Sequence, residues 1–194
     1  MNKIDLVFAT NNTNKVKEIQ LLIPHKINIL SLKDVNCLID LPETSDTLEG
    51  NAIQKAQYVY DNFNKNCFAD DTGLLVESIN NEPGVYSARY AGEHKNSNDN
   101  MDLLLQNLQN RENRNAKFQT VIALINDGKL TTFFGEVKGK IARKKSGKDG
   151  FGYDPIFIPN GLDISFSEMS LLDKNKISHR GIATRKLIEH LNKL

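Results

Sequence analysis

The sequence predicts an α/β protein built on a mixed, twisted β-sheet. In its first half, short runs of β-forming residues alternate with segments whose apolar residues recur at helical spacing. Further along, two β-rich segments are joined by Asn126-Asp127-Gly128, which is a strong hairpin signal. The chain has 194 residues, enough for one domain or for two lobes that share one sheet.

The first predicted elements are a strand, a polar loop, a helix and a second strand. The strand covers Ile4–Ala9, the loop covers Thr10–Lys15, and the helix ends at Pro24, which cannot continue it. The second strand is predicted over Ile27–Leu32, and a long helix over Thr47–Phe63 follows it.

The stretch CFADDTGLLVES is expected to form two strand pieces around an acidic turn. Asp70 and Asp71 stand between the apolar pieces Cys67–Ala69 and Leu74–Ser78, and Thr72-Gly73 is expected to break the strand. Consecutive side chains of a strand point to opposite faces, so the two acids cannot both face outward from one surface. Burying a charge is costly unless it has a partner, which indicates a cation here. The alternative is an acidic turn that only caps a strand end.

The second half is predicted to contain a helix, a hairpin and a terminal helix. The helices cover Asn96–Leu108 and His179–Leu194, and the hairpin surrounds Asn126-Asp127-Gly128.

Composition narrows the class of protein. The formal net charge is +1, which argues against a protein whose main task is to coat nucleic acid or an anionic membrane. Cys37 and Cys67 lie beside apolar residues, which favours buried free thiols over a disulfide. The apolar run near the start is too short for a signal peptide, and no stretch approaches the length of a membrane span, so a cytoplasmic location is expected. The basic run Lys138–Lys148 favours a solvated arm or a phosphate-facing edge.

The loop Thr10–Lys15 is a candidate phosphate site. It leaves a strand and enters a helix, so backbone N–H groups and the positive helix end face the gap. Lys15 adds a cation, and the loop lacks the glycines of a P-loop. The alternative is a helix N-cap in a polar loop.

The segment Glu43–Gln57 is a candidate second side of that site. Thr44, Ser45 or Asp46 can cap the helix, and Glu49 three residues after Asp46 resembles a capping box. Lys55 lies one turn after Asn51 on the same face, whereas Glu43 precedes the helix. A solvated amphipathic helix is the alternative.

The adjacent acids Asp70 and Asp71 could form a cation site together with Glu43. Mg²⁺ is usually bound by one or two carboxylates plus phosphate oxygens and water. Glu43 and Asp71 could be those carboxylates, with Asp70 supporting them from behind, and a carboxylate beside the metal can take a proton from water.

Two later stretches could bind a nucleobase. In GKDGFGYDPIF, glycines permit close approach of the backbone, and Phe151 and Tyr153 offer stacking faces beside Asp154. His179-Arg180 is rich in donors, and because arginine only donates, it favours a keto group over the amino group of adenine. The alternatives are a turn with packed aromatic rings and a pair of surface residues.

Six stretches in this order resemble the inosine/xanthosine triphosphate pyrophosphatase family. They are FATNNTNKVKEI, ETSDTLEGNAIQKA, FADDTGLLVE, PGVYSARYAG, GFGYDPIF and ISHRG. The likeness runs nearly end to end and is weakest in Lys95–Lys117 and Asn126–Lys148. The family hydrolyses non-standard purine nucleoside triphosphates such as ITP, dITP and XTP to the monophosphate and pyrophosphate with Mg²⁺.

The resemblance implies a fold and a set of site residues. The fold would be one domain over residues 1–194, an elongated mixed sheet flanked by helices with two lobes and a central active-site cleft, usually as a homodimer. Asp71 would be the proton acceptor and a metal ligand, and Glu43 would lie near the metal. The remaining positions would contact the purine nucleoside triphosphate: Thr10, Asn11, Asn12, Thr13, Asn14, Lys15, Lys55, Thr72, Phe151, Gly152, Tyr153, Asp154, Lys174, His179 and Arg180.

Two departures from the family pattern concern the edges of this site. Asn11 and Asn14 stand where the family often has glycine, and because asparagine tolerates left-handed backbone, the loop is expected to survive. Lys148-Asp149 replaces small residues before the Gly-Phe-Gly-Tyr-Asp run.

Three other functions fit parts of the sequence. A nucleotide-sensing module would bind without turnover. An aspartyl-phosphate phosphotransferase would need its aspartate at the end of the first strand, where this chain has Ala9-Thr10. An RNA-binding protein would use the basic run and show steeply salt-dependent binding.

Overall fold

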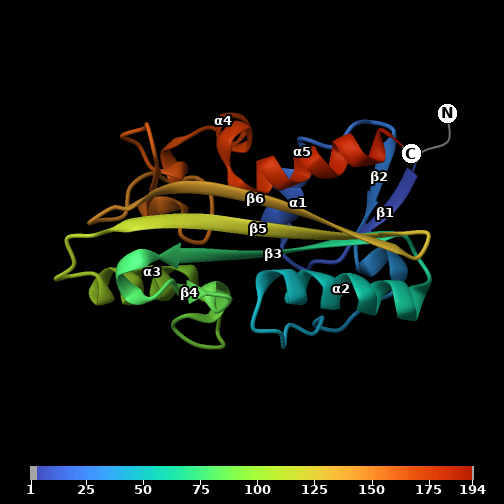
Figure 1. Cartoon of the computed structure of the whole chain (residues 1–194), viewed down its shortest axis with the longest axis horizontal. Helices are drawn as coiled ribbons and strands as arrows, with labels where there is room; N and C mark the ends of the chain where they lie inside the picture. Colours follow the sequence, from blue (N-terminus) through green and yellow to red (C-terminus); the bar gives the residue numbers. More distant parts are fainter. Residues whose placement is uncertain (1–3, 194) are drawn as a thin grey trace. The chain divides into compact units, whose positions relative to one another are not determined.

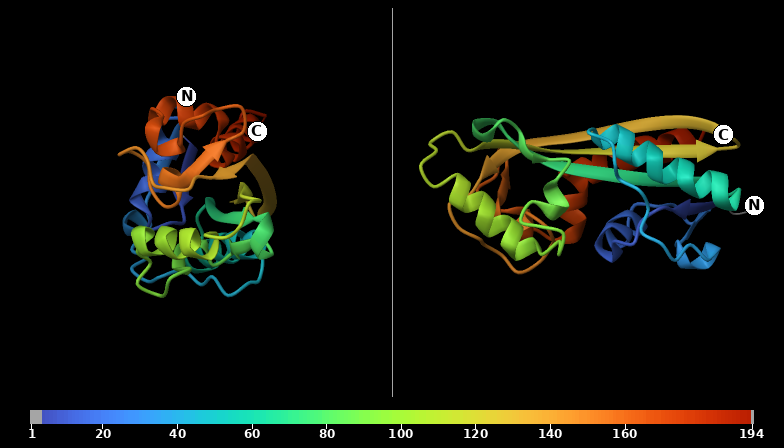
Figure 2. Two further views of the ribbon diagram at one scale, coloured as in Figure 1. Left: turned by 90° about the vertical axis from the view of Figure 1, so that its left-hand side faces the viewer. Right: turned by 90° about the horizontal axis from the view of Figure 1, so that it is seen from below.

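The computed structural model describes residues 4–193, which form a seven-stranded sheet and five α-helices (Figure 1, Figure 2). The strand order is β2 (Ile27–Leu30), β1 (Ile4–Phe8), β3 (Cys67–Val76), β5 (Asn115–Asn126), β6 (Lys129–Ile141) and β7 (Phe157–Pro159), and β4 (Glu82–Gly84) pairs with β3. The helices are α1 (Thr13–Gln20), α2 (Leu48–Phe63), α3 (Ser97–Asn107), α4 (Leu171–Ile177) and α5 (His179–Leu191). β1 is parallel to β2 and β3, whereas β4 and β7 are antiparallel to their partners. The predicted mixed α/β sheet is therefore confirmed.

The predicted break in the acidic segment is wrong. Thr72-Gly73 lies inside β3, which runs without interruption from Cys67 to Val76. The strand pairs with β1 at Cys67 and Phe68 and with β4 from Leu74 onward, and β5 lies beside it. Sheet pairing thus overrides the low strand preference of aspartate and glycine.

The predicted cap of the long helix is also wrong. The side chain of Thr47, not that of Thr44, Ser45 or Asp46, accepts a hydrogen bond from the Gly50 amide at 3.0 Å. The short elements α4, β4 and β7 were not predicted, because seven or three residues are too few to show a period. The expected end of the terminal helix, Leu194, lies outside the described residues.

The hairpin between β5 and β6 is confirmed. Asp127 and Gly128 connect the strands with positive φ angles of 49° and 78°. Positive φ at both central residues is typical of the two-residue turn whose twist matches a hairpin.

The chain forms two compact units. The first contains the chain up to Asp71, Thr120–Gly135 and the part from Arg180 onward. The second contains Thr72–Gln119 and Glu136–His179. The strands β3, β5 and β6 each contribute residues to both units.

The first unit has a hydrophobic core on each face of its sheet. On one face α2 packs on alternate strand residues, including Ala52 against Val7, Ala69 and Ala123. On the opposite face α1 and α5 cover the intervening residues, such as Phe8 and Phe68 (Figure 1). Side chains that alternate along β3 therefore meet different helices.

The second unit has its own core. α3, the turn before β7 and the strand residues Leu74, Phe118 and Phe157 supply its buried side chains. Cys37 and Cys67, both in the first unit, are free and buried, as the sequence predicts. None of the helices within residues 4–193 has the length and apolar character that crossing a membrane requires.

Candidate active site

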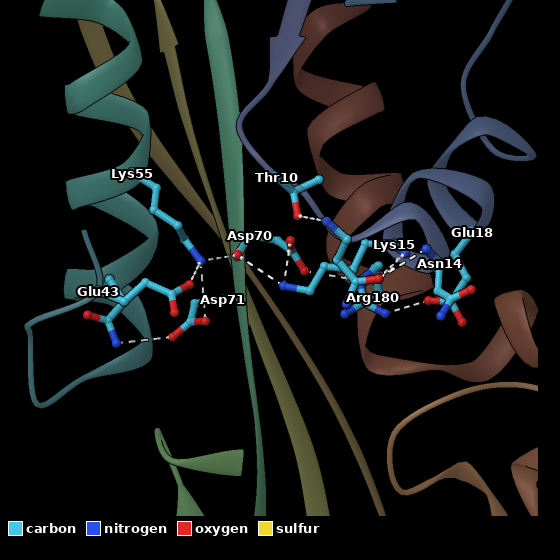
Figure 3. A network of polar contacts seen from close by, with 11 residues as sticks. Thr10, Asn14, Lys15, Glu18, Glu43, Lys55, Asp70, Asp71 and Arg180 are labelled. Atoms are coloured by element: carbon cyan, nitrogen blue, oxygen red, sulfur yellow. Dashed lines mark hydrogen bonds and ion pairs between the residues drawn. The ribbon is translucent and has the colours of Figure 1, made fainter. Parts of the chain in front are cut away.

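The two acids of β3 point to opposite faces of the sheet in the first unit. The side chain of Asp71 lies on the same face as that of Ala69, which α2 covers. The side chain of Asp70 lies on the opposite face together with that of Phe68, which α1 and α5 cover. Figure 3 shows their partners on either side of the strand. The alternation expected from the sequence thus separates two charged clusters.

The Asp70 cluster is buried and made of alternating charges. Lys15 Nζ lies 2.9 Å from Asp70 Oδ1, and Arg180 Nε donates to Asp70 Oδ2 at 3.1 Å. The other end of the guanidinium donates from Nη1 to Glu18. Burial disfavours the Asp70 carboxylate, but the charges of Lys15 and Arg180 outweigh that cost and hold its pKa well below the usual range. Asp70 is therefore a permanent anion that organises two cations.

The Asp71 cluster is more open and has an excess of acid. Lys55 Nζ contacts Glu43 and lies 3.4 Å from Asp71 Oδ1, while Asn51 Nδ2 donates to Asp71 Oδ2 at 3.3 Å. Burial raises the pKa of Asp71, because it outweighs the attraction of Lys55 and of Lys15, and Glu43 adds to the rise. Burial opposes the Lys55 ammonium, yet the carboxylates around it raise its pKa. Lys55 is thus charged at neutral pH.

The two lysines meet at one backbone atom. The carbonyl oxygen of Asp70 accepts from Lys55 Nζ at 2.8 Å and from Lys15 Nζ at 3.3 Å (Figure 3). One lysine comes from α2 and the other from α1, so β3 carries an ammonium group on each side.

The loop before α1 is folded back on itself. Thr10 Oγ1 accepts from the Asn12 amide at 3.1 Å, and Asn12 Oδ1 caps the amides of Asn14 and Lys15 at 3.0 and 3.3 Å. The side chain of Asn11 donates to Asp40 at 3.3 Å. Thr13 is exposed, as are Asn11, Asn12 and Asn14. Asn11 and Asn14 are not among the residues with positive φ, so the loop forms without the left-handed backbone for which asparagine was expected to be needed.

Glu43 and Asp71 are the residues that could hold a divalent cation. Both carboxylates contact one ammonium group, and their side chains keep 32% and 12% of their exposure, so they converge where a ligand can reach them. Within residues 4–193, no group of three histidine, cysteine or acidic side chains is arranged to hold a metal. Two converging carboxylates fit Mg²⁺, which takes its remaining ligands from phosphate and water.

In the second unit, Asp154 joins Lys174 to the aromatic turn. Asp154 Oδ2 accepts from Lys174 Nζ at 2.5 Å and from the Phe151 amide at 2.8 Å. The ammonium also lies 5.0 Å from the centre of the Phe151 ring. Gly152 has φ of +63°, in the region that favours glycine, so the turn depends on it.

Tyr153 and His179 are packed inside the second unit. The Tyr153 ring belongs to the hydrophobic core, and its hydroxyl donates to the Ser87 carbonyl at 2.9 Å. The His179 ring stacks on Phe118 with 4.5 Å between centres. Thr72, half-buried in β3, is the first residue of this unit.

Sequence reasoning missed two residues that organise these clusters. Glu18 lies buried within α1 although it is an acid, and its position among Val16 and Ile19 was the available signal. Ser87 stands in the PGVYSARYAG stretch, which resembled the family but received no role. Its hydroxyl accepts from the Leu74 amide at 2.9 Å.

The basic run has acidic partners at two of its cations. Arg143 lies 3.4 Å from Glu112, and Lys145 lies 2.7 Å from Asp102. Ion pairs of this exposed kind fit the predicted solvated arm.

Fold and site together define an α/β protein in which two lysines and two converging carboxylates gather around one strand. A family model described as the Ham1 family matches residues 6–190. The chain belongs to the Ham1 family.

Individual relatives cover almost the whole chain. A protein of Flavobacterium johnsoniae named dITP/XTP pyrophosphatase is 58% identical over 186 residues, 96% of this chain and 97% of the relative. A protein of the same name from Porphyromonas gingivalis is 48% identical, covering 96% of both chains.

Solved structures agree with the fold. The Ham1 protein of Staphylococcus aureus superimposes with a TM-score of 0.89 at 39% identity, covering 97% of this chain and 98% of that one. A HAM1 protein from Coxiella burnetii gives a TM-score of 0.90 at 34% identity, covering 98% of this chain and 100% of the other.

Proposed function

We propose that this protein hydrolyses non-standard purine nucleoside triphosphates, namely ITP, dITP and XTP, to the monophosphate and pyrophosphate. The observation that carries the proposal is the pair of lysines that meet at the Asp70 carbonyl beside the converging carboxylates of Asp71 and Glu43. Relatives that share more than half of the sequence are named dITP/XTP pyrophosphatase. That support favours an enzyme over a sensor without turnover.

Asp71 is proposed as the general base. The water that attacks the α-phosphorus gives its proton to the Asp71 carboxylate, and the bond from the α-phosphorus to the bridging oxygen breaks. A carboxyl group whose pKa is raised by burial is a better proton acceptor than an exposed one. Glu43 and Asp71 would hold Mg²⁺, which when bound supplies positive charge at the phosphate oxygens.

Lys15 and Lys55 are proposed to stabilise the leaving pyrophosphate. Both are held in place by Asp70 and its carbonyl before any ligand binds, so little reorganisation is needed. The loop from Thr10 through Asn14 adds neutral donors, since the side chains of Asn11, Asn12, Thr13 and Asn14 are exposed.

Contacts to the base and sugar are proposed for the remaining predicted positions. Phe151 offers a ring beside the Lys174 ammonium, and Gly152 leaves the backbone of the turn accessible. Thr72, Tyr153, Asp154, His179 and Arg180 complete the proposed set on the strength of the family resemblance. A keto purine would satisfy these donors, whereas an amino purine would leave them unpaired. Homodimer formation and a cytoplasmic location remain predictions from the sequence.

A panel of nucleoside triphosphates tests the proposal, with pyrophosphate and phosphate measured separately. We expect pyrophosphate from ITP, dITP and XTP with Mg²⁺, and a loss of turnover in Asp71→Asn by a factor of about 10³ or more. Asp46→Asn, at an exposed acid just before α2, is the matched control and should behave as wild type. Binding of ITP without any product would favour the sensor, and phosphate as the sole product would exclude cleavage at the α-phosphorus.

A further inference from the structure

Glu18 is a buried acid that the proposed chemistry does not use. It lies on α1 three residues after Lys15, and its side chain is 3% exposed. Glutamate is seldom buried to this extent unless it is paired. Its partner is the guanidinium of Arg180, which is itself 2% exposed.

Arg180 connects Glu18 to Asp70. Nη1 of the guanidinium faces Glu18, while Nε donates to Asp70 Oδ2 at 3.1 Å. Asp70 therefore divides its two oxygens, because Oδ1 lies 2.9 Å from Lys15 Nζ. The four side chains form a line of alternating charge that ends at Lys15 (Figure 3).

We propose that Glu18 is a positioning residue for phosphate binding. By holding one side of Arg180, it leaves Oδ1 of Asp70 to Lys15 and so fixes the ammonium that faces the phosphates. Glu18 itself touches no substrate. The inference rests on the proposed function, since it assumes that Lys15 binds the leaving pyrophosphate.

Neutralising Glu18 changes the balance within this line. Glu18→Gln removes the negative charge that faces Nη1 of Arg180, so the guanidinium is drawn more strongly to the Asp70 carboxylate, which Lys15 also contacts. A guanidinium can take both oxygens of a carboxylate in a bidentate pair, which an ammonium cannot do. Arg180 then displaces Lys15 from Oδ1, and Lys15 loses its fixed position.

The test measures binding of pyrophosphate by calorimetry in the presence of Mg²⁺. We expect Glu18→Gln to weaken this binding about tenfold, because Lys15 loses its fixed position. Glu189→Gln is the matched control, since it makes the same change at an exposed acid on α5. A merely structural role would weaken pyrophosphate binding equally whether or not Lys15 is present.

A double-mutant cycle identifies the residue through which Glu18 acts. In a Lys15→Met background, Glu18→Gln should change the affinity for pyrophosphate less than about twofold, because the group it positions is gone. An undiminished tenfold effect in that background would overturn the proposal. So would unchanged pyrophosphate binding in Glu18→Gln.

A second variant covers the case in which Glu18→Gln does not fold. Glu18→Gln with Arg180→Met removes both members of the pair, a change that buried ion pairs tolerate better than the loss of one partner. Pyrophosphate affinity should then stay within about twofold of wild type, because the guanidinium no longer competes with Lys15 for Asp70. A tenfold loss in this folded variant contradicts the proposal.

Different measurements decide the proposed function and the role of Glu18. Release of pyrophosphate from ITP by the wild type decides the proposed function. Binding of pyrophosphate needs no turnover and decides the role of Glu18. A wild-type protein that does not bind pyrophosphate would overturn that role as well.

Discussion

Adjacent carboxylates in β3 should respond in opposite ways to the same substitution. Asp70 is fully buried with its charge paired to Lys15 and Arg180, and its pKa is lowered. Asp71 is one residue further along, and burial raises its pKa. We therefore expect Asp70→Asn to destabilise the fold strongly, whereas Asp71→Asn leaves stability unchanged or slightly higher.

The size of the Asp70 effect follows from its contacts. Removing one member of a buried ion pair costs about 3–5 kcal/mol, since the partner is left buried and unpaired. Glu18 still faces Arg180 in the variant, so the ammonium group of Lys15 is the one that loses its paired carboxylate. For a urea dependence of about 2–3 kcal/mol per M, the unfolding midpoint should fall by about 1–2.5 M.

Equilibrium unfolding in urea at pH 7, followed by circular dichroism, measures both variants. Equal losses of stability in Asp70→Asn and Asp71→Asn would refute the reasoning, as would a midpoint for Asp70→Asn equal to that of the wild type. Activity gives the complementary readout, because Asp71→Asn should fold normally and yet lose turnover.

The pH dependence of the Asp70 effect has a defined sign. Because the folded pKa is lowered, the stabilisation is fully present above the unfolded value, about 3.9, and is lost as the pH falls further towards the folded pKa. The gap between wild type and Asp70→Asn should therefore persist from pH 7 to about pH 5 and narrow below about pH 4. A gap that narrows on raising the pH from 5 to 7 would contradict the assignment.

Three further predictions test the packing around the site. Gly50→Ala should lower both turnover and thermal stability. A Cβ there would lie 2.0 Å from Ser45 Oγ and 2.9 Å from Thr47 Oγ1, so it would disturb the helix cap and displace the segment carrying Glu43; unchanged kcat/KM would contradict this. Tyr153→Phe should cost about 1 kcal/mol in urea unfolding, since it removes the hydroxyl bonded to the Ser87 carbonyl; no loss would show that this bond contributes nothing. Cys67 should resist alkylation at pH 8 until the protein unfolds, because burial raises its pKa to about 12, and rapid labelling of the native thiol would contradict its burial.

The sequence was sufficient for the elements with a clear period or a specific turn. The long helix ending at Phe63 and the hairpin at Asp127-Gly128 lie where the pattern places them, whereas α1 begins within the predicted loop and ends at Gln20, before the expected stop at Pro24. Local signals were insufficient at Thr72-Gly73, because strands distant in sequence pair with β3 there and supply its hydrogen bonds. The cap at Thr47 was missed for a related reason, since four neighbouring side chains could all have capped the helix.

The sequence was sufficient to predict the charged part of the candidate site, because buried acids need partners of opposite charge. Two adjacent acids after an apolar run needed cations, and the structure supplies Lys15 on one face and Lys55 on the other. Which lysine meets which acid depends on the helices that cover each face, and no local pattern contains that. Glu18 was missed because its partner Arg180 is 162 residues away in the chain.

A continuous strand explains how two lysines can approach one carbonyl from opposite sides. Burial lowers the pKa of Lys15, whereas the carboxylates around Lys55 raise its pKa against the cost of burial. Asp70 and Asp71 are consecutive in this strand, so their side chains point to opposite faces. In β3 each face has its own acid, so Lys15 is paired with Asp70 and Lys55 with Asp71 and Glu43. Two ammonium groups that share the Asp70 oxygen repel one another, and only charges on both faces can offset that repulsion. The alternation of side chains along an unbroken strand is therefore the feature that allows this concentration of positive charge.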